Sequence, residues 1–216
     1  MARATLVFLL ILPSFALGMK ETLTEHFKKS SIRSELSKDN TFYIAISGFG
    51  FRERFLEINS PMRHITKILK RSDKPYLTLP HNEKVKNNIK IAPVFQCQYD
   101  RLVLFALSWG VNQAYKIAEI YAKYCGREVD AVYIFDGVQK PTGAFKQKFS
   151  ARECFNVYQS RGPIRGGPIP SCQNLNLKKF CTRENLRGYP QFVPCHNMTY
   201  SEPARVLSKL LNQNGH

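Results

Sequence analysis

A buried-strand pattern passes directly into a helical pattern in the segment Arg101-Leu-Val-Leu-Phe-Ala-Leu-Ser-Trp-Gly-Val-Asn-Gln-Ala-Tyr-Lys-Ile-Ala-Glu-Ile-Tyr121. Residues 102–107 are all apolar, and a run this short favours a strand covered on both faces of a parallel sheet. After Gly110, apolar residues recur at helical spacing with polar residues between them. The segment therefore predicts a strand, a sharp turn and a helix.

The turn would hold Ser108 at its apex. Such a turn needs small side chains two residues before and two residues after the apex, because bulky ones would collide with neighbouring backbone. Here these positions hold Ala106 and Gly110. The serine hydroxyl would then lie beside the N-terminal amides of a helix. The alternative is that Ser108 is an ordinary N-cap, a position where serine is favoured.

The pentapeptide Ala106-Leu-Ser-Trp-Gly110 resembles the nucleophile elbow G-x-S-x-G of the α/β-hydrolase superfamily of lipases and esterases. It differs only at the first glycine, where some lipases also carry alanine. The resemblance covers roughly residues 41–211. It implies an α/β three-layer sandwich with a mostly parallel sheet, of cutinase-like size and without a large cap domain. It also implies a serine hydrolase, lipase- or esterase-like, that cleaves carboxylic esters.

A second strand pattern places a carboxylate near the serine. Residues 129–135 are the next apolar run and end at Asp136-Gly137, so strand, helix and strand predict a parallel βαβ unit. Open α/β sheets bind ligands at the carboxyl ends of their strands. We therefore expect Asp136 at the edge of the sheet that carries Ser108. An Asp-Gly pair after a strand is otherwise a common turn.

His196 is the candidate base. A nucleophilic serine needs a base to take its proton and a carboxylate to orient that base. Of the five histidines, His196 lies just before a closing helix that we expect to start at Ser201-Glu-Pro203. The order Ser108, Asp136, His196 matches the order of the resembling superfamily. Glu184 is the reserve candidate for the acid, and a solvated loop residue is the alternative interpretation of His196.

Residues 41–46 predict another buried strand, followed by Ser47-Gly-Phe-Gly50. In the resembling lipases, a loop at this place supplies one backbone amide of the oxyanion hole. That assigns Phe49, or its neighbour Gly50, to this role together with the amide of Trp109. A plain turn is the alternative. The sequon Asn197-Met-Thr199 would place a glycan beside His196, where it would obstruct the site.

The remaining segments carry weaker patterns. We expect a helix over Pro61–Arg71 and a strand over 154–158. Ile91–Phe95 favours a short, irregular strand because Pro93 interrupts it. We expect irregular structure at 73–90, 139–152 and 160–187.

Residues 1–18 predict a secretory signal, with Arg3, an apolar run over 6–12 and a small-x-small site that ends at Gly18. We expect an arm or covering helix over 19–40 and one α/β domain over 41–216, secreted or periplasmic. Six cysteines in an exported chain predict disulfides, without indicating their pairing, and their spacing does not favour a metal site.

The chain has 32 Lys and Arg against 16 Asp and Glu, a formal net charge of +16. This charge favours contact with an anionic membrane or glycan surface, or serves only solubility. No nucleic-acid-binding motif is present, and we expect an ester or lipid substrate, no cofactor or metal, and a monomer. Two other functions fit: a non-catalytic protein of the same fold that binds an anionic surface, and an acyltransferase with the same triad.

Overall fold

The computed structural model describes residues 17–30, 40–48, 62–82, 91–139, 143–187, 189 and 194–212. Within them, six strands form one sheet in the order β2-β1-β3-β4-β7-β8, and every neighbouring pair is parallel. The strands are β1 (Thr41–Ile46), β2 (Tyr76–Leu79), β3 (Arg101–Leu107), β4 (Val129–Phe135), β7 (Ala151–Tyr158) and β8 (Gln173–Asn176). Two short strands, β5 (Val138–Gln139) and β6 (Gly143–Ala144), pair with each other in antiparallel fashion.

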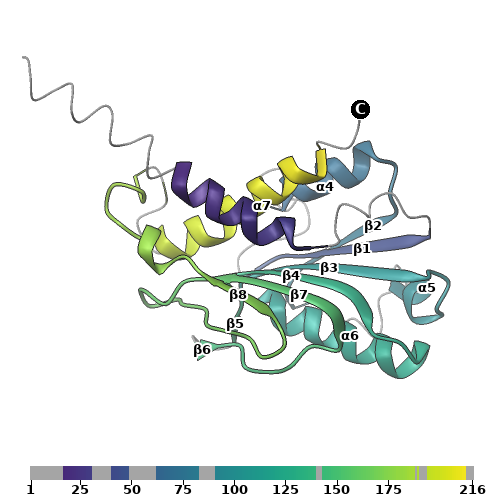
Figure 1. Cartoon of the computed structure of the whole chain (residues 1–216). Coiled ribbons are helices and arrows are strands. Elements are labelled where there is room, and N and C mark those ends of the chain that lie inside the picture. Colours follow the sequence, from purple (N-terminus) through teal and green to yellow (C-terminus); the bar gives the residue numbers. More distant parts are fainter. Residues whose placement is uncertain are drawn as a thin grey trace, which may run out of the picture.

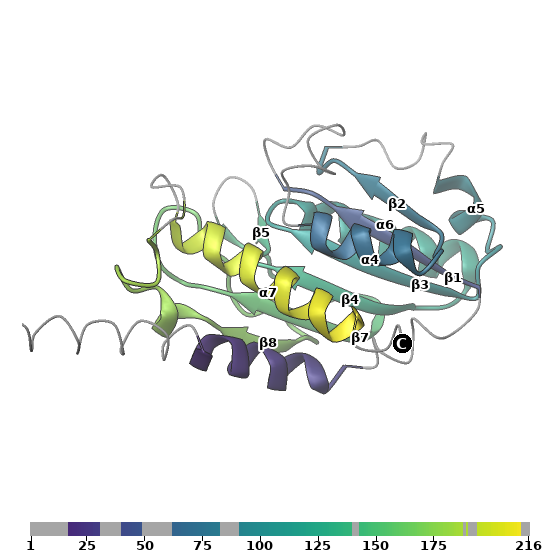
Figure 2. The same cartoon turned by 90° about the horizontal axis from the view of Figure 1, so that it is seen from above.

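Helices cover both faces of the sheet (Figure 1). A helix over 17–28, α4 (Arg63–Arg71) and α7 (Pro194–Asn212) lie on one face, side by side in Figure 2. The other face carries α5 (Ala92–Phe95) and α6 (Gly110–Cys125). The expected α/β three-layer fold with a parallel sheet is therefore confirmed, and the described residues include no large cap domain.

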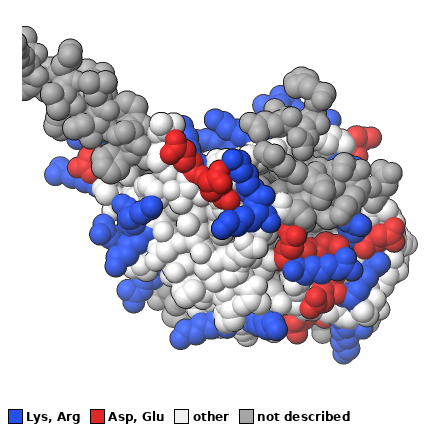
Figure 3. Space-filling view, viewed as in Figure 1, with Lys and Arg blue, Asp and Glu red and all other residues white. Residues whose placement is uncertain are grey.

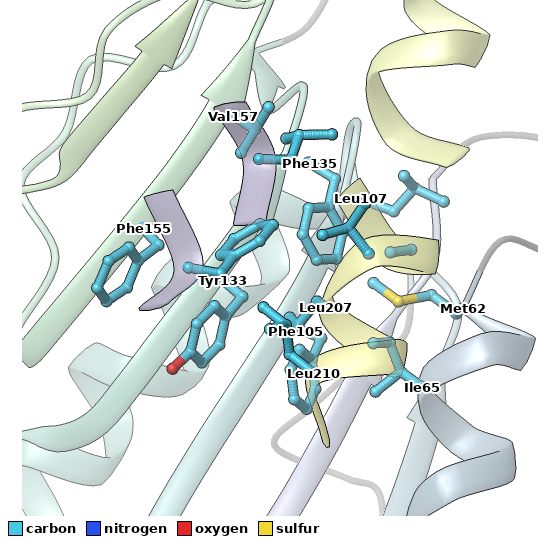
Figure 4. Close-up of a cluster of buried hydrophobic side chains, with 14 of the residues drawn as sticks. Met62, Ile65, Phe105, Leu107, Tyr133, Phe135, Phe155, Val157, Leu207 and Leu210 are labelled. Carbon is cyan, nitrogen blue, oxygen red and sulfur yellow. The ribbon is translucent and has the colours of Figure 1, made fainter. Parts of the chain in front are cut away.

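Side chains that alternate along the central strands pack into two separate hydrophobic cores, one on each face of the sheet. From β3, Phe105 and Leu107 pack toward α4 and α7, in the cluster that Figure 4 shows, whereas Leu104 and Ala106 pack toward α6. This follows from the two-residue period of a strand. Because both faces of β3 are buried, its sequence is an uninterrupted apolar run instead of an alternating one.

The helix over 17–28 belongs to the first of these cores. Its Leu23 and Phe27 are fully buried, and the Phe27 ring contacts the rings of Tyr133 and Phe135 on β4. This segment therefore covers the sheet.

Several local expectations are wrong. Residues 92–95 form helix α5 instead of a strand, because Pro93 is compatible with the first turn of a helix. The edge strands β2 and β8 lie in segments that we expected to be irregular. Helix α7 starts at Pro194 instead of Ser201 and contains Pro203, since burial of its apolar side outweighs the one hydrogen bond that this proline removes.

All six cysteines are paired, which confirms the predicted disulfides. Cys97 bonds to Cys125, Cys154 to Cys172, and Cys181 to Cys195. Three disulfides are typical of proteins in oxidising, extracellular environments. Across the described ranges, no helix has both the length and the apolar character that a membrane span requires.

Candidate active site

Ser108 follows the last residue of β3 and has a left-handed backbone, with φ of 52°. Its amide donates a hydrogen bond to the Phe135 carbonyl at the end of β4, and its own carbonyl accepts bonds from Val111 and Val138. The residue that precedes α6 is Trp109, and no side chain caps this helix. The N-cap interpretation of Ser108 is therefore wrong, and the serine lies at the apex of a sharp strand-to-helix turn.

Two glycines allow this turn to pack closely against the end of β1. A Cβ atom added at Gly110 would lie 2.7 Å from the Ser47 carbonyl oxygen and 2.8 Å from that of Ile46. A Cβ atom added at Gly48 would lie 2.8 Å from the Ser108 Cβ. The expected need for a small residue at Gly110 thus has a direct steric cause, and the loop after β1 lies against the serine.

The structure brings Ser108, Asp136 and His196 together from three distant parts of the chain. His196 Nε2 lies 2.9 Å from Ser108 Oγ, and His196 Nδ1 lies 2.6 Å from Asp136 Oδ2. Ser108 and His196 are 6% and 5% exposed, and Asp136 is fully buried. Both ring nitrogens of the histidine are therefore occupied in the arrangement of a serine, histidine and carboxylate triad.

The buried carboxylate of Asp136 accepts hydrogen bonds on both oxygens. Oδ1 accepts from the backbone amides of Gln159 at 3.1 Å and Gly166 at 3.0 Å. Oδ2 accepts from the Gln159 side-chain amide at 3.0 Å in addition to His196. These donors satisfy a carboxylate that would otherwise be costly to bury. A Cβ atom at Gly166 would lie 2.4 Å from Oδ1, so only glycine fits there.

Sequence reasoning missed Gln159 and Gly166. Gln159 directly follows β7, which is the parallel neighbour of β4. The rule that pointed to Asp136, that polar residues after parallel strands meet at one edge, would have found Gln159 as well. No sequence signal distinguishes Gly166 from the other glycines of its loop.

A second network holds the loop that contains Gly166. The side-chain amide of Asn156, on β7, donates to the Gly167 carbonyl at 2.9 Å and to the Asn174 side chain at 2.7 Å. Asn174 in turn bonds to both the amide and the carbonyl of Ile169, and the disulfide between Cys154 and Cys172 closes the loop on β7. The segment that we expected to be an irregular loop therefore holds the carboxylate in place.

His196 lies in the first turn of α7 and not in a loop before it. The neighbouring Cys195 is bonded to Cys181, and the Tyr200 ring meets the imidazole edge-on at 5.3 Å. The sequon residues Asn197 and Thr199 are buried in the same turn, where the Tyr200 hydroxyl donates to the Asn197 side chain. In the folded chain this asparagine is therefore inaccessible to a glycan.

Of the expected oxyanion donors, Trp109 is the first residue after the serine and leads into α6. Its indole ring packs against His81, with the ring centres 5.9 Å apart. Phe49 and Gly50 lie outside the described residues. The reserve acid, Glu184, is exposed, and hydrogen bonds from its own backbone amide and then from the Thr182 hydroxyl lower the pKa of its carboxyl. It does not contact His196, whose ring nitrogens bond Ser108 and Asp136.

The part of the chain that the structure describes contains no group of three or more His, Cys, Asp or Glu side chains placed to hold a metal ion. The chain matches no protein-family model, no curated protein and no solved structure. The arrangement of the described residues is therefore the basis on which a function can be argued.

Proposed function

We propose that this protein is a secreted or periplasmic serine hydrolase of the α/β-hydrolase type that cleaves carboxylic esters through an acyl-enzyme. The observation that carries the proposal is the pair of hydrogen bonds that link Ser108 Oγ to His196 Nε2 and His196 Nδ1 to Asp136 Oδ2. Three residue types with complementary roles meet at the carboxyl edge of a parallel sheet, where such folds bind ligands.

In the proposed reaction, His196 Nε2 takes the proton of Ser108 while Oγ attacks the carbonyl carbon of the ester. Asp136 stays ionised, holds the imidazole by Nδ1 and stabilises the imidazolium that forms. Backbone amides, with Trp109 as the described candidate, bind the oxyanion of the tetrahedral intermediate. His196 then gives its proton to the leaving alkoxide. In the second half of the reaction water attacks the acyl-enzyme, His196 takes the proton of this water and returns it to Ser108 Oγ, and the acyl group leaves as the free acid.

The left-handed turn supports the nucleophile role of Ser108. Ser108 has φ of 52°, a conformation that costs a non-glycine residue on the order of 1 kcal/mol. The turn moves Oγ off the end of β3 and toward His196. Backbone strain of this kind is found where a side chain must be presented for chemistry.

The proposed export signal agrees with the packing of the first helix. Leu17 is exposed, whereas Met19, Leu23 and Phe27 are buried against the sheet. Of the described residues, cleavage after Gly18 would therefore remove only Leu17 and Gly18, and neither belongs to the core. The three disulfides fit the oxidising compartment to which such a signal leads.

Hydrolysis of short p-nitrophenyl esters tests the proposal. Wild-type protein should release nitrophenol, and Ser108→Ala should abolish this activity while the protein stays folded. Ser72→Ala, at an exposed position after α4, is the matched control and should behave as wild type. Added alcohols distinguish the acyltransferase alternative, because they would accept the acyl group in preference to water. A folded wild-type protein without any turnover would favour the non-catalytic binding protein.

A further inference from the structure

Helix α4 concentrates positive charge on one side. Its nine residues include Arg63, Lys67, Lys70 and Arg71 and no acidic residue. The opposite side, which includes Ile65 and Leu69, is buried in the core. The apolar side therefore fixes the helix on the sheet, and the basic side faces solvent.

The basic side of α4 borders a hollow of about 480 Å³ next to the edge strand β2. The described residues that line this α4 hollow are Arg63, His64, Thr66, Lys67, Lys70 and Tyr76, and none of these is acidic. Lys67 and Lys70 form no ion pair with any residue that the structure describes. Elsewhere, for example at the lower right of Figure 3, basic and acidic side chains lie next to each other.

Two described acidic residues lie near α4: Asp73 follows it in the chain, and Glu202 acts on His64. Glu202 is already paired. Glu202 Oε1 accepts hydrogen bonds from Arg205 and from the Tyr189 hydroxyl, both at 2.7 Å. Burial lowers the pKa of His64, and the positive charges of Arg63 and then Arg205 lower it further, against the opposing effect of Glu202. Among the charges that act on the pKa of His64, the positive ones of Arg63, Arg205 and Lys67 thus outnumber the negative one of Glu202.

A second basic hollow, of about 380 Å³, lies between α7 and the helix over 17–28. Four cations, Lys20, Lys28, Arg205 and Lys209, border it together with the acidic Glu202, Thr24 and the apolar Val206 and Leu210. Lys28 is paired with Glu25 and Arg205 with Glu202, whereas Lys20 and Lys209 form no ion pair with a described residue. Helix α7 runs between this hollow and α4 (Figure 2). We call these two hollows and the surface of α7 between them the basic face.

The shape and composition of the basic face limit its partner. Among the described residues the exposed large apolar side chains are Leu17, which precedes the expected cleavage site at the start of the helix over 17–28, and Tyr124, which lies on α6. Peripheral membrane binding normally adds inserted apolar side chains to charge attraction, and binding of single-stranded nucleic acid adds exposed aromatic rings. The basic face lacks both of these features. Two cationic hollows separated by a helix are better matched by a flexible chain that carries anionic groups at regular intervals.

We infer that the basic face binds an extended acidic polysaccharide, whose sulfate or carboxylate groups enter the two hollows. The site lies on the helical layer and is separate from the carboxyl edge of the sheet, where Ser108 lies. The inference concerns attachment to a polyanion and does not depend on ester hydrolysis.

Binding of the full chain to immobilised heparin, a sulfated polysaccharide, tests the inference. The double variant Lys67→Gln with Lys70→Gln should bind about tenfold more weakly, because each lost charge contact of this kind is worth a few-fold in affinity. The matched control is Lys116→Gln with Lys123→Gln, which removes the same charge from exposed positions of α6 on the opposite face. This control should keep most of the affinity, and both variants should keep wild-type esterase activity.

Three results would overturn the inference. Equal loss of heparin binding in the two double variants would show that only net charge matters. Stronger binding to anionic phospholipid vesicles than to heparin, lost in the α4 variant, would assign the face to a membrane. The same pattern with a short DNA oligonucleotide would assign it to nucleic acid.

Discussion

Two residues of the candidate active site, Ser108 and Asp136, have left-handed backbones, with φ of 52° and 49°. Each comes directly after a central strand, and each is held by backbone hydrogen bonds to the neighbouring strand. Because a side chain disfavours this conformation, both positions lower the stability of the fold, and in return the side chain points in the required direction. The cost in free energy of unfolding can be measured at Ser108.

Ser108→Gly should raise the free energy of unfolding by about 1 kcal/mol, since glycine adopts φ of 52° without strain. The same variant should have no esterase activity. Ser108→Ala removes the hydroxyl but keeps the strain, so it should be inactive without this gain in stability. Urea unfolding of the three proteins measures the difference. A glycine variant less stable than wild type would contradict the account of a strained apex.

Asp136→Asn should lower turnover by on the order of 10⁴ with little change in KM, by analogy with the loss seen when the orienting carboxylate of a serine protease becomes an amide. The reason is that an amide neither stabilises the imidazolium nor holds the histidine in the required tautomer. Glu184→Gln, at the exposed reserve position, should leave turnover close to wild type. Near-normal turnover of Asp136→Asn together with loss of turnover in Glu184→Gln would show that Glu184, and not Asp136, is the acid that orients His196.

At the scale of elements, the first turn of α7 carries both His196 and Cys195, whose disulfide fixes this turn to another part of the chain. Cys195 is tied to Cys181, which lies just after a short 3-10 helix, and the Cys181 carbonyl accepts a hydrogen bond from Arg161 at 2.8 Å. The disulfide therefore limits the movement of the turn that positions the imidazole.

Replacing Cys181 and Cys195 by serine should lower stability by about 3 kcal/mol, as expected for a loop of this length. It should also lower kcat at temperatures where the protein stays folded, because the histidine turn loses its anchor. Replacing Cys97 and Cys125 is the control: it should reduce stability but leave kcat unchanged, since this disulfide joins the segment before β3 to the far end of α6. Equal effects on kcat would contradict a positioning role.

The elements that could be predicted from sequence are those buried on both sides. The runs at 102–107 and 129–135 are apolar because the sheet is covered on both faces, and Gly126 ends α6 in a left-handed conformation. The edge strand β8 could not be predicted, because Gln173-Asn-Leu-Asn176 is mostly polar and takes its conformation from pairing with β7. The start of α7 could not be predicted for a related reason. Pro203 favours a helix that begins beside it, but burial of the preceding residues in the core extends the helix back to Pro194.

The meeting of Ser108, Asp136 and His196 could be predicted because chain order, strand ends and residue types all point to one edge of the sheet. The support around it could not, since the contacts of Gln159 and Gly166 with Asp136 depend on how the loop after β7 folds back. That fold depends on buried side-chain networks and a disulfide that sequence spacing leaves open.

At the scale of the whole molecule, the covering helix over 17–28 makes stability depend on pH. His26 packs edge-on against Phe27 and Phe155, and burial, followed by the charge of Lys29, lowers its pKa from 6.5 to about 4. Between these two values the unfolded chain binds the proton and the folded chain does not. Stability is therefore full above about pH 6.5 and falls as the pH drops toward 4.

His26→Phe should remove this dependence. We expect wild type to lose on the order of 1–2 kcal/mol of additional stability between pH 7 and pH 4.5 relative to the variant, a figure reduced for partial solvent screening. Urea unfolding of both proteins at the two pH values measures it. Identical pH dependence in the two proteins would show that His26 is not held neutral by the core.

The most direct test of the proposed serine hydrolase is covalent labelling with a fluorophosphonate probe, followed by mass spectrometry of the labelled peptide. The probe reacts with a serine only when a base activates the hydroxyl, so it reports on the link between Ser108 and His196 without knowledge of the substrate. We predict a single phosphonylated residue, Ser108, and no labelling of Ser108→Ala or His196→Ala. A folded wild-type protein that stays unlabelled, or a label on another serine, would contradict the proposal.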